Sequence, residues 1–262
     1  MKKLLLATAG LLIVALSSAS AADLAVKARS AAPSPVWDWT GFYAGVHAGA
    51  GWGTTESTLT SISAPGVPAV AFNLPVAQNN RSGFLGGGQI GYNFQSGWAV
   101  FGVQADIAGL DVKGTTPCLT ILSCTAKSDW LATATGRVGG AVFDKTLVYV
   151  KGGAAWLNTT HTVTIPAAIL GGLGAGSSSS VTTTSFGWLL GMGAEYAFSP
   201  NWSAFLEYDY IEFDKKSAVL DLSTLGGLGA GAVTGNVDFK NKLSIAKVGV
   251  NYRFGGPIAA RY

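Results

Sequence analysis

Residues 242–254 read KLSIAKVGVNYRF, and this stretch alternates like a β-strand. Every second residue from Val248 to Phe254 is apolar or aromatic. The positions between them are polar, charged or small: Lys247, Gly249, Asn251 and Arg253. Because side chains of a strand point to opposite faces in turn, one face of this strand is apolar and the other polar. The aromatic residues near its end are typical of the interfacial girdle of a membrane barrel.

Seven earlier stretches alternate in the same way, with apolar residues on one face and polar residues or glycine on the other. They are residues 40–53, 83–94, 98–110, 129–143, 146–157, 185–198 and 202–213. About eight strands of about ten residues each are typical of a transmembrane β-barrel, which turns apolar residues to lipid and polar residues inward. The sequence therefore predicts an all-β fold, an eight-stranded antiparallel up-and-down transmembrane β-barrel over residues 40–254. Closure of the barrel also pairs every strand edge.

The composition indicates a membrane protein that is not built from spanning helices. Only 12% of the 262 residues are charged, against about 25% in a typical soluble domain. The chain also contains 36 glycines and is 48% hydrophobic, yet no internal stretch reaches the roughly 18 consecutive apolar residues of a spanning helix. A barrel explains both observations, because only half of its strand residues need to be apolar.

The N-terminal residues 1–21 have the features of a signal peptide. Two lysines precede an apolar run, and Ala19-Ser20-Ala21 is a small-residue cleavage site. Cleavage removes two of the 17 bases and none of the 14 acids, so the net charge falls from +3 to +1. A nearly neutral chain lacks the concentrated basic face of a nucleic-acid-binding protein, and no nucleic acid partner is expected. Residues 22–39 are expected to form an extended periplasmic leader, and residues 255–262 a C-terminal tail.

The connections between the predicted strands alternate between long and short. Outer-membrane barrels combine short periplasmic turns with long external loops, so both ends of this chain are expected in the periplasm. The expected long loops are residues 54–82, 111–128, 158–183 and 214–239. The hexapeptide GGLGAG occurs in two of them, at residues 171–176 and 226–231. This repeat is either low-complexity drift or a pair of loops that pack together or bind an apolar ligand.

The two cysteines, Cys118 and Cys124, lie close together in one of the expected loops. Export to an oxidising compartment favours a disulfide between them. The alternative is a metal site, but no histidine or third cysteine lies nearby to complete one. The sequence therefore predicts a disulfide, and it predicts no metal site and no cofactor.

Eight charged side chains project into the barrel interior by the same alternation. They are Asp106, Arg137, Lys151, Glu195, Glu207, Asp209, Lys247 and Arg253. A barrel of about eight strands is narrow enough for side chains to fill it, and opposite charges there should pair because an unpaired buried charge is costly. We expect a plug of ion pairs. The alternative is a charged lining that selects ions in an open pore.

The histidines give little support for an enzyme. The chain has only His47, predicted to face the barrel interior, and His161, predicted in a long loop. No serine or acid stands at a spacing that specifies a catalytic partner for either, so no catalytic residue is predicted. His161 lies close to the apolar run 165–173 and is a candidate loop ligand for haem. The alternative is a solvated loop residue.

Several segments together resemble a known family. They are PVWDWTGFYAGVHAGAGWG (35–53), GQIGYNF (88–94), GRVG (136–139), VYVKGGAAW (148–156), GAEYAF (193–198), LEYDY (206–210) and KVGVNYRF (247–254). In this combination the chain resembles the alphaproteobacterial outer-membrane surface-antigen family of small, porin-family OmpA-like barrels. The resemblance covers nearly all of the mature chain. It implies an eight-stranded barrel in the outer membrane of a Gram-negative cell, and haem binding or porin activity in some members.

One feature departs from that family pattern. Many barrels end on an aromatic residue that the barrel assembly machinery reads, whereas this chain continues past Phe254 with GGPIAARY. Either Phe254 or Tyr262 could serve as that residue. The expected partners are this machinery and outer-membrane lipid, including lipopolysaccharide.

Two classes of function compete. The first is a structural and surface role, without catalysis, for a barrel with long extracellular loops. The second is transport, through a small porin or through loops that capture a ligand such as haem or another small solute. A more remote third reading is an adhesin. Conductance of the purified barrel would distinguish the pore hypothesis from the other hypotheses.

Overall fold

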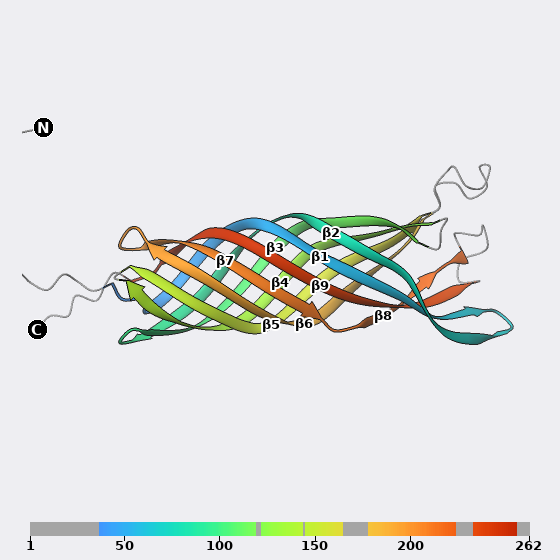
Figure 1. Ribbon diagram of the computed structural model, residues 1–262, viewed down its shortest axis with the longest axis horizontal. Helices are drawn as coiled ribbons and strands as arrows, with labels where there is room; N and C mark the ends of the chain where they lie inside the picture. The colour runs from blue at the N-terminus through green and yellow to red at the C-terminus, as the bar shows by residue number, and fades with distance from the viewer. Residues whose placement is uncertain (1–36, 119–121, 144, 165–177, 224–232, 256–262) are drawn as a thin grey trace, which may run out of the picture. The chain divides into compact units, whose positions relative to one another are not determined.

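The computed structural model describes residues 37–118, 122–143, 145–164, 178–223 and 233–255 (Figure 1). All of the described residues belong to the compact unit that begins at Pro35. None of the described residues forms a helix long and apolar enough to cross a membrane. Several predicted features lie outside the described residues: the signal peptide (1–21), most of the leader (22–36), the apolar run 165–173, both GGLGAG copies and Tyr262.

The described residues form nine β-strands. They are β1 (Gly41–Ala64), β2 (Val67–Ser96), β3 (Ala99–Cys118), β4 (Leu122–Phe143), β5 (Thr146–Thr164), β6 (Ser178–Ala197), β7 (Trp202–Phe213), β8 (Lys216–Asp221) and β9 (Thr234–Arg253). Strands β1 to β6 each pair antiparallel with the next along the chain, and β9 pairs with both β7 and β1, which closes the ring.

Strand β8 does not add a ninth position to the ring. It pairs with β9 from Lys216↔Phe239 onward, directly beyond the end of the β7 ladder at Glu212↔Lys242. Strands β7 and β8 are therefore two parts of one interrupted strand. The predicted eight-stranded antiparallel up-and-down barrel is confirmed.

The two ends of the barrel differ. Strand β1 begins and β9 ends at the same end, where Tyr43 pairs with Arg253, and we call this the terminal end (Figure 1). The connections β2–β3, β4–β5 and β6–β7 also lie there and are short. We call the opposite end the distal end.

The predicted long loops were largely wrong, because the strands continue into them. Strands β1 and β2 run to a turn at Pro65-Gly66, in which Gly66 has φ 76°. The residues between Trp52 and this turn still alternate, with Leu59 inward and Glu56 outward. The strands were predicted from apolar residues on the outward face. Beyond the lipid the outward residues are polar, so the pattern no longer identified a strand there. Threonine-rich segments favour strand, so the ladder extends past the membrane.

An apolar band with aromatic edges surrounds the barrel. Its terminal edge includes the ring pairs Phe42–Tyr92 and Trp202–Tyr252, and its distal edge includes Trp156–Phe186 and Trp188–Tyr210. Between these edges the outward side chains are exposed and apolar: Val46, Ile90, Val103, Val138, Val150, Leu190, Leu206 and Val248. About ten residues of each strand lie in the band, which is the length that spans a bilayer. This band is the membrane-spanning part of the protein.

Polar and apolar layers alternate inside the barrel. Strand β9 shows the order from the terminal end: Lys247 is followed by Ile245 and Leu243, then by Asn241, and then by Phe239. The inner apolar cluster, at the terminal end, comprises Trp39, Val100, Leu147, Tyr149 and Ala197. The middle apolar cluster includes Leu85, Leu110, Val112, Leu131, Leu157, Leu189, Ile211, Phe213, Leu243 and Ile245. The outer apolar cluster comprises Leu59, Leu220, Val237 and Phe239.

Candidate functional site

The centre of the interior charge network is a group of two lysines and two carboxylates. Lys151 Nζ lies 2.5 Å from Glu207 Oε1 and 3.3 Å from Asp209 Oδ2. Lys247 Nζ lies 2.8 Å and 3.2 Å from the same two oxygens. All four side chains are buried, so each ammonium group is neutralised within the barrel rather than by solvent.

The strand register explains how these residues meet. Glu207 and Asp209 are successive inward residues of β7, and Lys247 lies directly opposite Glu207 on β9. Lys151 is on β5, and β6 runs between β5 and β7. The β6 residue at this level is Gly191, paired with both Lys151 and Asp209. A Cβ atom on Gly191 would stand 2.1 Å from Asp209 Oδ1, so only glycine leaves room for the contact across β6.

Further side chains complete this group. Lys247 Nζ also lies 3.7 Å from Asp106 Oδ1, and the Thr133 hydroxyl donates to Asp106 Oδ2 at 2.6 Å. The Tyr149 hydroxyl donates to Glu207 Oε2 at 2.8 Å. The carboxylates of Asp106 and Glu207 therefore accept hydrogen bonds in addition to their ion pairs.

Arg137 and Glu195 form a second pair, closer to the terminal end. Arg137 Nη1 lies 3.3 Å from Glu195 Oε2, and Arg137 Nε donates to Asn93 Oδ1 at 2.9 Å. The guanidinium group is also stacked between two aromatic rings, 4.6 Å from the Tyr43 centroid and 5.0 Å from that of Tyr149. Planar charge between two aromatic faces is a geometry that arginine provides and lysine does not.

Arg253 does not join either group. Its guanidinium lies over Trp37, 4.5 Å from the ring centroid, and Nη2 donates to the Pro200 carbonyl at 3.2 Å. It therefore holds the last leader residues against the β6–β7 turn at the terminal end. Seven of the eight predicted interior charges form ion pairs in the barrel interior, and Arg253 lies apart from them.

His161 does not lie in a loop, and the prediction that placed it there was wrong. It is an inward residue of β5, 5% exposed, with its ring stacked on Phe239 at 3.8 Å between centroids. Its Nε2 lies 3.4 Å from the Thr183 hydroxyl. It stands beyond the aromatic edge of the membrane band at Trp156. Burial, together with the nearby positive charge of Arg81, lowers the pKa of His161 to about 3, so the imidazole is neutral at physiological pH.

A small apolar cavity lies at this distal level, with a volume of about 70 Å³. Its wall is made mainly by the outer apolar cluster and by Val76, Val163 and Leu222, and its polar members include His161 and Asn79. The volume is far below the roughly 300 Å³ and more of a typical ligand pocket, so the described walls admit only a small apolar group.

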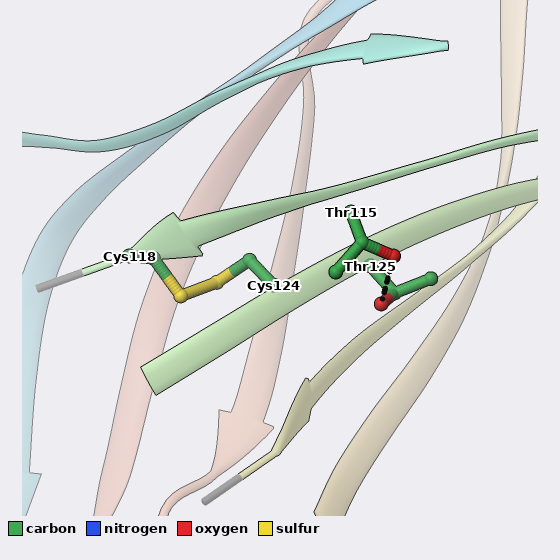
Figure 2. Close-up of a disulfide and its surroundings, with 4 residues drawn as sticks. All are labelled: Thr115, Cys118, Cys124 and Thr125. Carbon is green, nitrogen blue, oxygen red and sulfur yellow. Dashed lines mark hydrogen bonds between the residues drawn. A yellow bond between two sulfur atoms is a disulfide. The ribbon is translucent and has the colours of Figure 1, made fainter. Parts of the chain in front are cut away.

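A disulfide joins Cys118, at the end of β3, to Cys124 on β4 (Figure 2). The two sulfurs cross-link the tip of the β3–β4 hairpin and line the distal cavity. Figure 2 also shows Thr115 and Thr125 facing each other across the same strands, with their hydroxyls 2.9 Å apart. The distal extension of this hairpin is therefore held by a covalent bond as well as by its ladder.

The sequence analysis missed Arg81, an inward residue of β2 that is 2% exposed. It fell in the expected loop 54–82 and was not counted among the interior charges. Arg81 is separated from Leu85, Gln89 and Asn93 by four, eight and twelve positions, and because these spacings are even, it shares their face of the strand; this was the available signal.

Comparisons with known proteins agree with this architecture. A family model described as "Outer membrane protein beta-barrel domain" matches residues 9–254. The chain is 31% identical over 265 residues to a 31 kDa outer-membrane immunogenic protein of Brucella melitensis biotype 1, a match that covers 97% of this chain and 100% of that protein. It is 28% identical over 198 residues to a 22 kDa outer membrane protein of Rhizobium leguminosarum bv. viciae, covering 74% of each.

Among solved structures, the outer membrane protein OprG from Pseudomonas aeruginosa is similar with a TM-score of 0.45 and 14% identity, over 82% of this chain and 97% of that one. The family match and the Brucella relative both extend across the whole barrel, and they confirm the resemblance seen in the sequence segments. The chain therefore belongs to the outer membrane protein β-barrel domain family and is an integral protein of the outer membrane.

Proposed function

We propose that the protein is a closed, non-catalytic surface barrel. The distal parts of its strands extend beyond the membrane and are exposed on the outside of the cell. The observation that carries this proposal is the sequence of layers in the interior. The ion-paired lysines fill one level, and the middle apolar cluster fills the next with side chains that are almost fully buried. An ion that moved along the axis would have to break buried ion pairs and then cross an apolar layer, both of which are costly.

Single-channel conductance of the folded protein in a planar bilayer tests closure. Folding is checked first by heat-dependent gel mobility, and a known open porin in the same bilayer is the positive control. We expect a silent membrane. Discrete, reproducible current steps from folded protein would contradict the proposal and would favour the porin.

The outward orientation of the distal end is supported by its polar surface. Beyond the aromatic edge the outward residues of β1 and β5 are polar, as in Glu56, Thr58, Thr160 and Thr162. A membrane-impermeant maleimide tests this on intact cells, because both described cysteines are in the disulfide. We expect Val70→Cys, exposed at the distal end, to be labelled, and Phe143→Cys at the terminal end to be labelled only after permeabilisation. The reverse pattern would contradict the orientation.

Non-catalysis is supported by the surroundings of the two histidines. His47 is buried in the charge layer, and His161 is stacked on Phe239. Among the described residues, neither forms the nucleophile–histidine–acid arrangement of a hydrolase. We further propose that lipid and lipopolysaccharide surround the apolar band, and that the barrel assembly machinery reads the β9 end at Phe254.

Ligand capture at the distal end is a second candidate function, favoured by the cavity and by the neutral imidazole in its wall. Haem is larger than this cavity, so its capture at His161 requires the outer apolar cluster to open; absorbance titration of haem into the wild type and into His161→Ala tests this. The capture proposal requires weaker binding in the variant. An unchanged affinity would remove His161 as the ligand.

A further inference from the structure

Arg81 is a buried cation without a carboxylate partner. Its side chain is 2% exposed, yet among the described residues no carboxylate oxygen lies within 4 Å of its guanidinium. By contrast, Arg137, Lys151 and Lys247 each have at least one carboxylate within that distance. A buried charge is costly unless an opposite charge compensates it, so the surroundings of Arg81 call for an anion.

Two buried N–H donors, on Arg81 and Asn241, lack a partner among the described residues, as does one nearby acceptor, Asn79 Oδ1. Arg81 Nη1 donates to Ser128 Oγ at 2.6 Å, and Nη2 donates to Asn241 Oδ1 at 3.2 Å. The Thr55 hydroxyl donates to the same Asn241 oxygen at 2.7 Å. Because guanidinium can only donate, Asn241 must present its oxygen to Arg81 and its NH₂ group elsewhere. Neither that Nδ2 nor Arg81 Nε has a partner among the described residues.

The layer around these groups is polar and enclosed. Asn79, Thr159 and Ser185 are also buried at this level. On β9, Leu243 of the middle apolar cluster lies on the terminal side of Asn241, and Phe239 of the outer cluster lies on its distal side. The apolar layers on either side lower the local dielectric constant, which strengthens electrostatic attraction within the polar layer.

The distal cavity approaches this level. Asn79 lines the distal cavity and is the next inward residue from Arg81 on β2. Asn79 and Arg81 are about 7 Å apart along the strand backbone, so the cavity lies one inward position from Arg81. With a volume of about 70 Å³, the cavity is too small for a bulky organic anion.

We propose that this layer is a binding site for a small monovalent anion of the halide class, held by Arg81 and by Asn241 Nδ2. The anion accepts the two buried N–H groups and supplies the missing negative charge. Inorganic cations are excluded by the guanidinium. The alternative, in which water alone satisfies these donors, predicts no dependence on the identity of the anion.

The test uses the full mature chain folded in detergent and compares sodium chloride with sodium gluconate at equal ionic strength. The midpoint of thermal unfolding, followed by gel mobility, is expected to be a few °C higher in chloride, because a ligand that binds only the folded state stabilises it. Arg81→Met should lose this difference. The matched control is Lys113→Met, an exposed lysine on the neighbouring strand β3, which should keep it.

A second variant covers the case in which Arg81→Met fails to fold. Asn241→Asp places a carboxylate beside Arg81 and should replace the bound anion, so that the chloride effect disappears while the fold remains stable in gluconate. No difference between the two salts in the wild type would overturn the proposal. A difference that persists in both Arg81→Met and Asn241→Asp would show an adventitious ion only, bound elsewhere, and would overturn it equally.

Discussion

Lys151 on β5 and Glu207 on β7 lie 2.5 Å apart, from Nζ to Oε1, although β6 runs between their strands. Gly191, the β6 residue paired with Lys151 on one side and with Asp209 on the other, has no side chain and so leaves room for Lys151 to reach the acids of β7. The closure of the interior thus depends on where a glycine faces inward as well as on which charges are present.

Gly191→Ala should therefore destabilise the barrel. The new Cβ would stand 2.1 Å from Asp209 Oδ1 and 3.0 Å from the Tyr208 carbonyl oxygen, so the charge layer must shift. We expect a loss of about 1–3 kcal/mol in the free energy of unfolding, measured by urea titration of the protein in detergent. Gly152→Ala on β5 is the control, because its Cβ would meet only the Leu189 carbonyl oxygen, at 3.5 Å. Equal effects of the two substitutions would contradict this account.

Glu207→Gln removes the carboxylate shared by the two lysines. Both Lys151 and Lys247 then depend on the remaining acids, and we expect a loss of about 3–5 kcal/mol because uncompensated charge is left buried. The contrasting pair is Lys127–Asp129, which is 3.4 Å apart and partly exposed to solvent. Asp129→Asn should cost less than about 1 kcal/mol in the same urea titration. A Glu207→Gln variant as stable as Asp129→Asn would show that the interior pairs do not hold the barrel.

The sequence alone predicted the membrane band but not the distal barrel. Alternation around Val248 identified the outward face, because lipid demands apolar residues there. The same rule failed beyond Trp52, where Glu56 and Thr58 face water and nothing apolar marks the outward side. Arg81 was lost for this reason, since its stretch was predicted to be a loop.

The interior contacts were predicted only in part. Alternation placed Lys151 and Glu207 on the inner face, and the narrow barrel implied that such charges pair. It could not select partners across β6, because that choice depends on the stagger of the strands and on Gly191. Arg253 shows the limit most clearly. The alternation correctly placed Arg253 on the inward face. Its position at the end of β9, however, puts it over Trp37 and away from the acids.

The disulfide should stabilise the distal end and leave the membrane band unaffected. Cys118 and Cys124 close a short loop in a hairpin already paired along its length, so their removal should cost about 2 kcal/mol. In a variant with both cysteines changed to serine, amide hydrogen exchange should increase near Thr115 and Thr125 and stay slow at Arg137. Faster exchange throughout the barrel would contradict a local role.

Acidification should loosen the distal end through His161. Its pKa is about 3 in the folded protein, against an ordinary value of 6.5, so the opened state binds a proton first as the pH falls. The stabilising contribution of the neutral ring is therefore complete above pH 6.5, and it is lost progressively between pH 6.5 and pH 3, by about 1.4 kcal/mol per pH unit. Hydrogen exchange at the β5 and β9 amides near His161 and Phe239 should accelerate between pH 7 and pH 4, after correction for the intrinsic exchange rate.

His161→Phe isolates this effect from the titration of the carboxylates. Phenylalanine can keep the stack on Phe239 but does not titrate, so the corrected exchange at these amides should change less with pH than in the wild type. The buried acids near Lys247 are the same in both proteins, and their contribution cancels in the comparison. An identical pH dependence in the two proteins would mean that His161 is protonated without opening the distal end, and that its ring is less enclosed than its 5% exposure indicates.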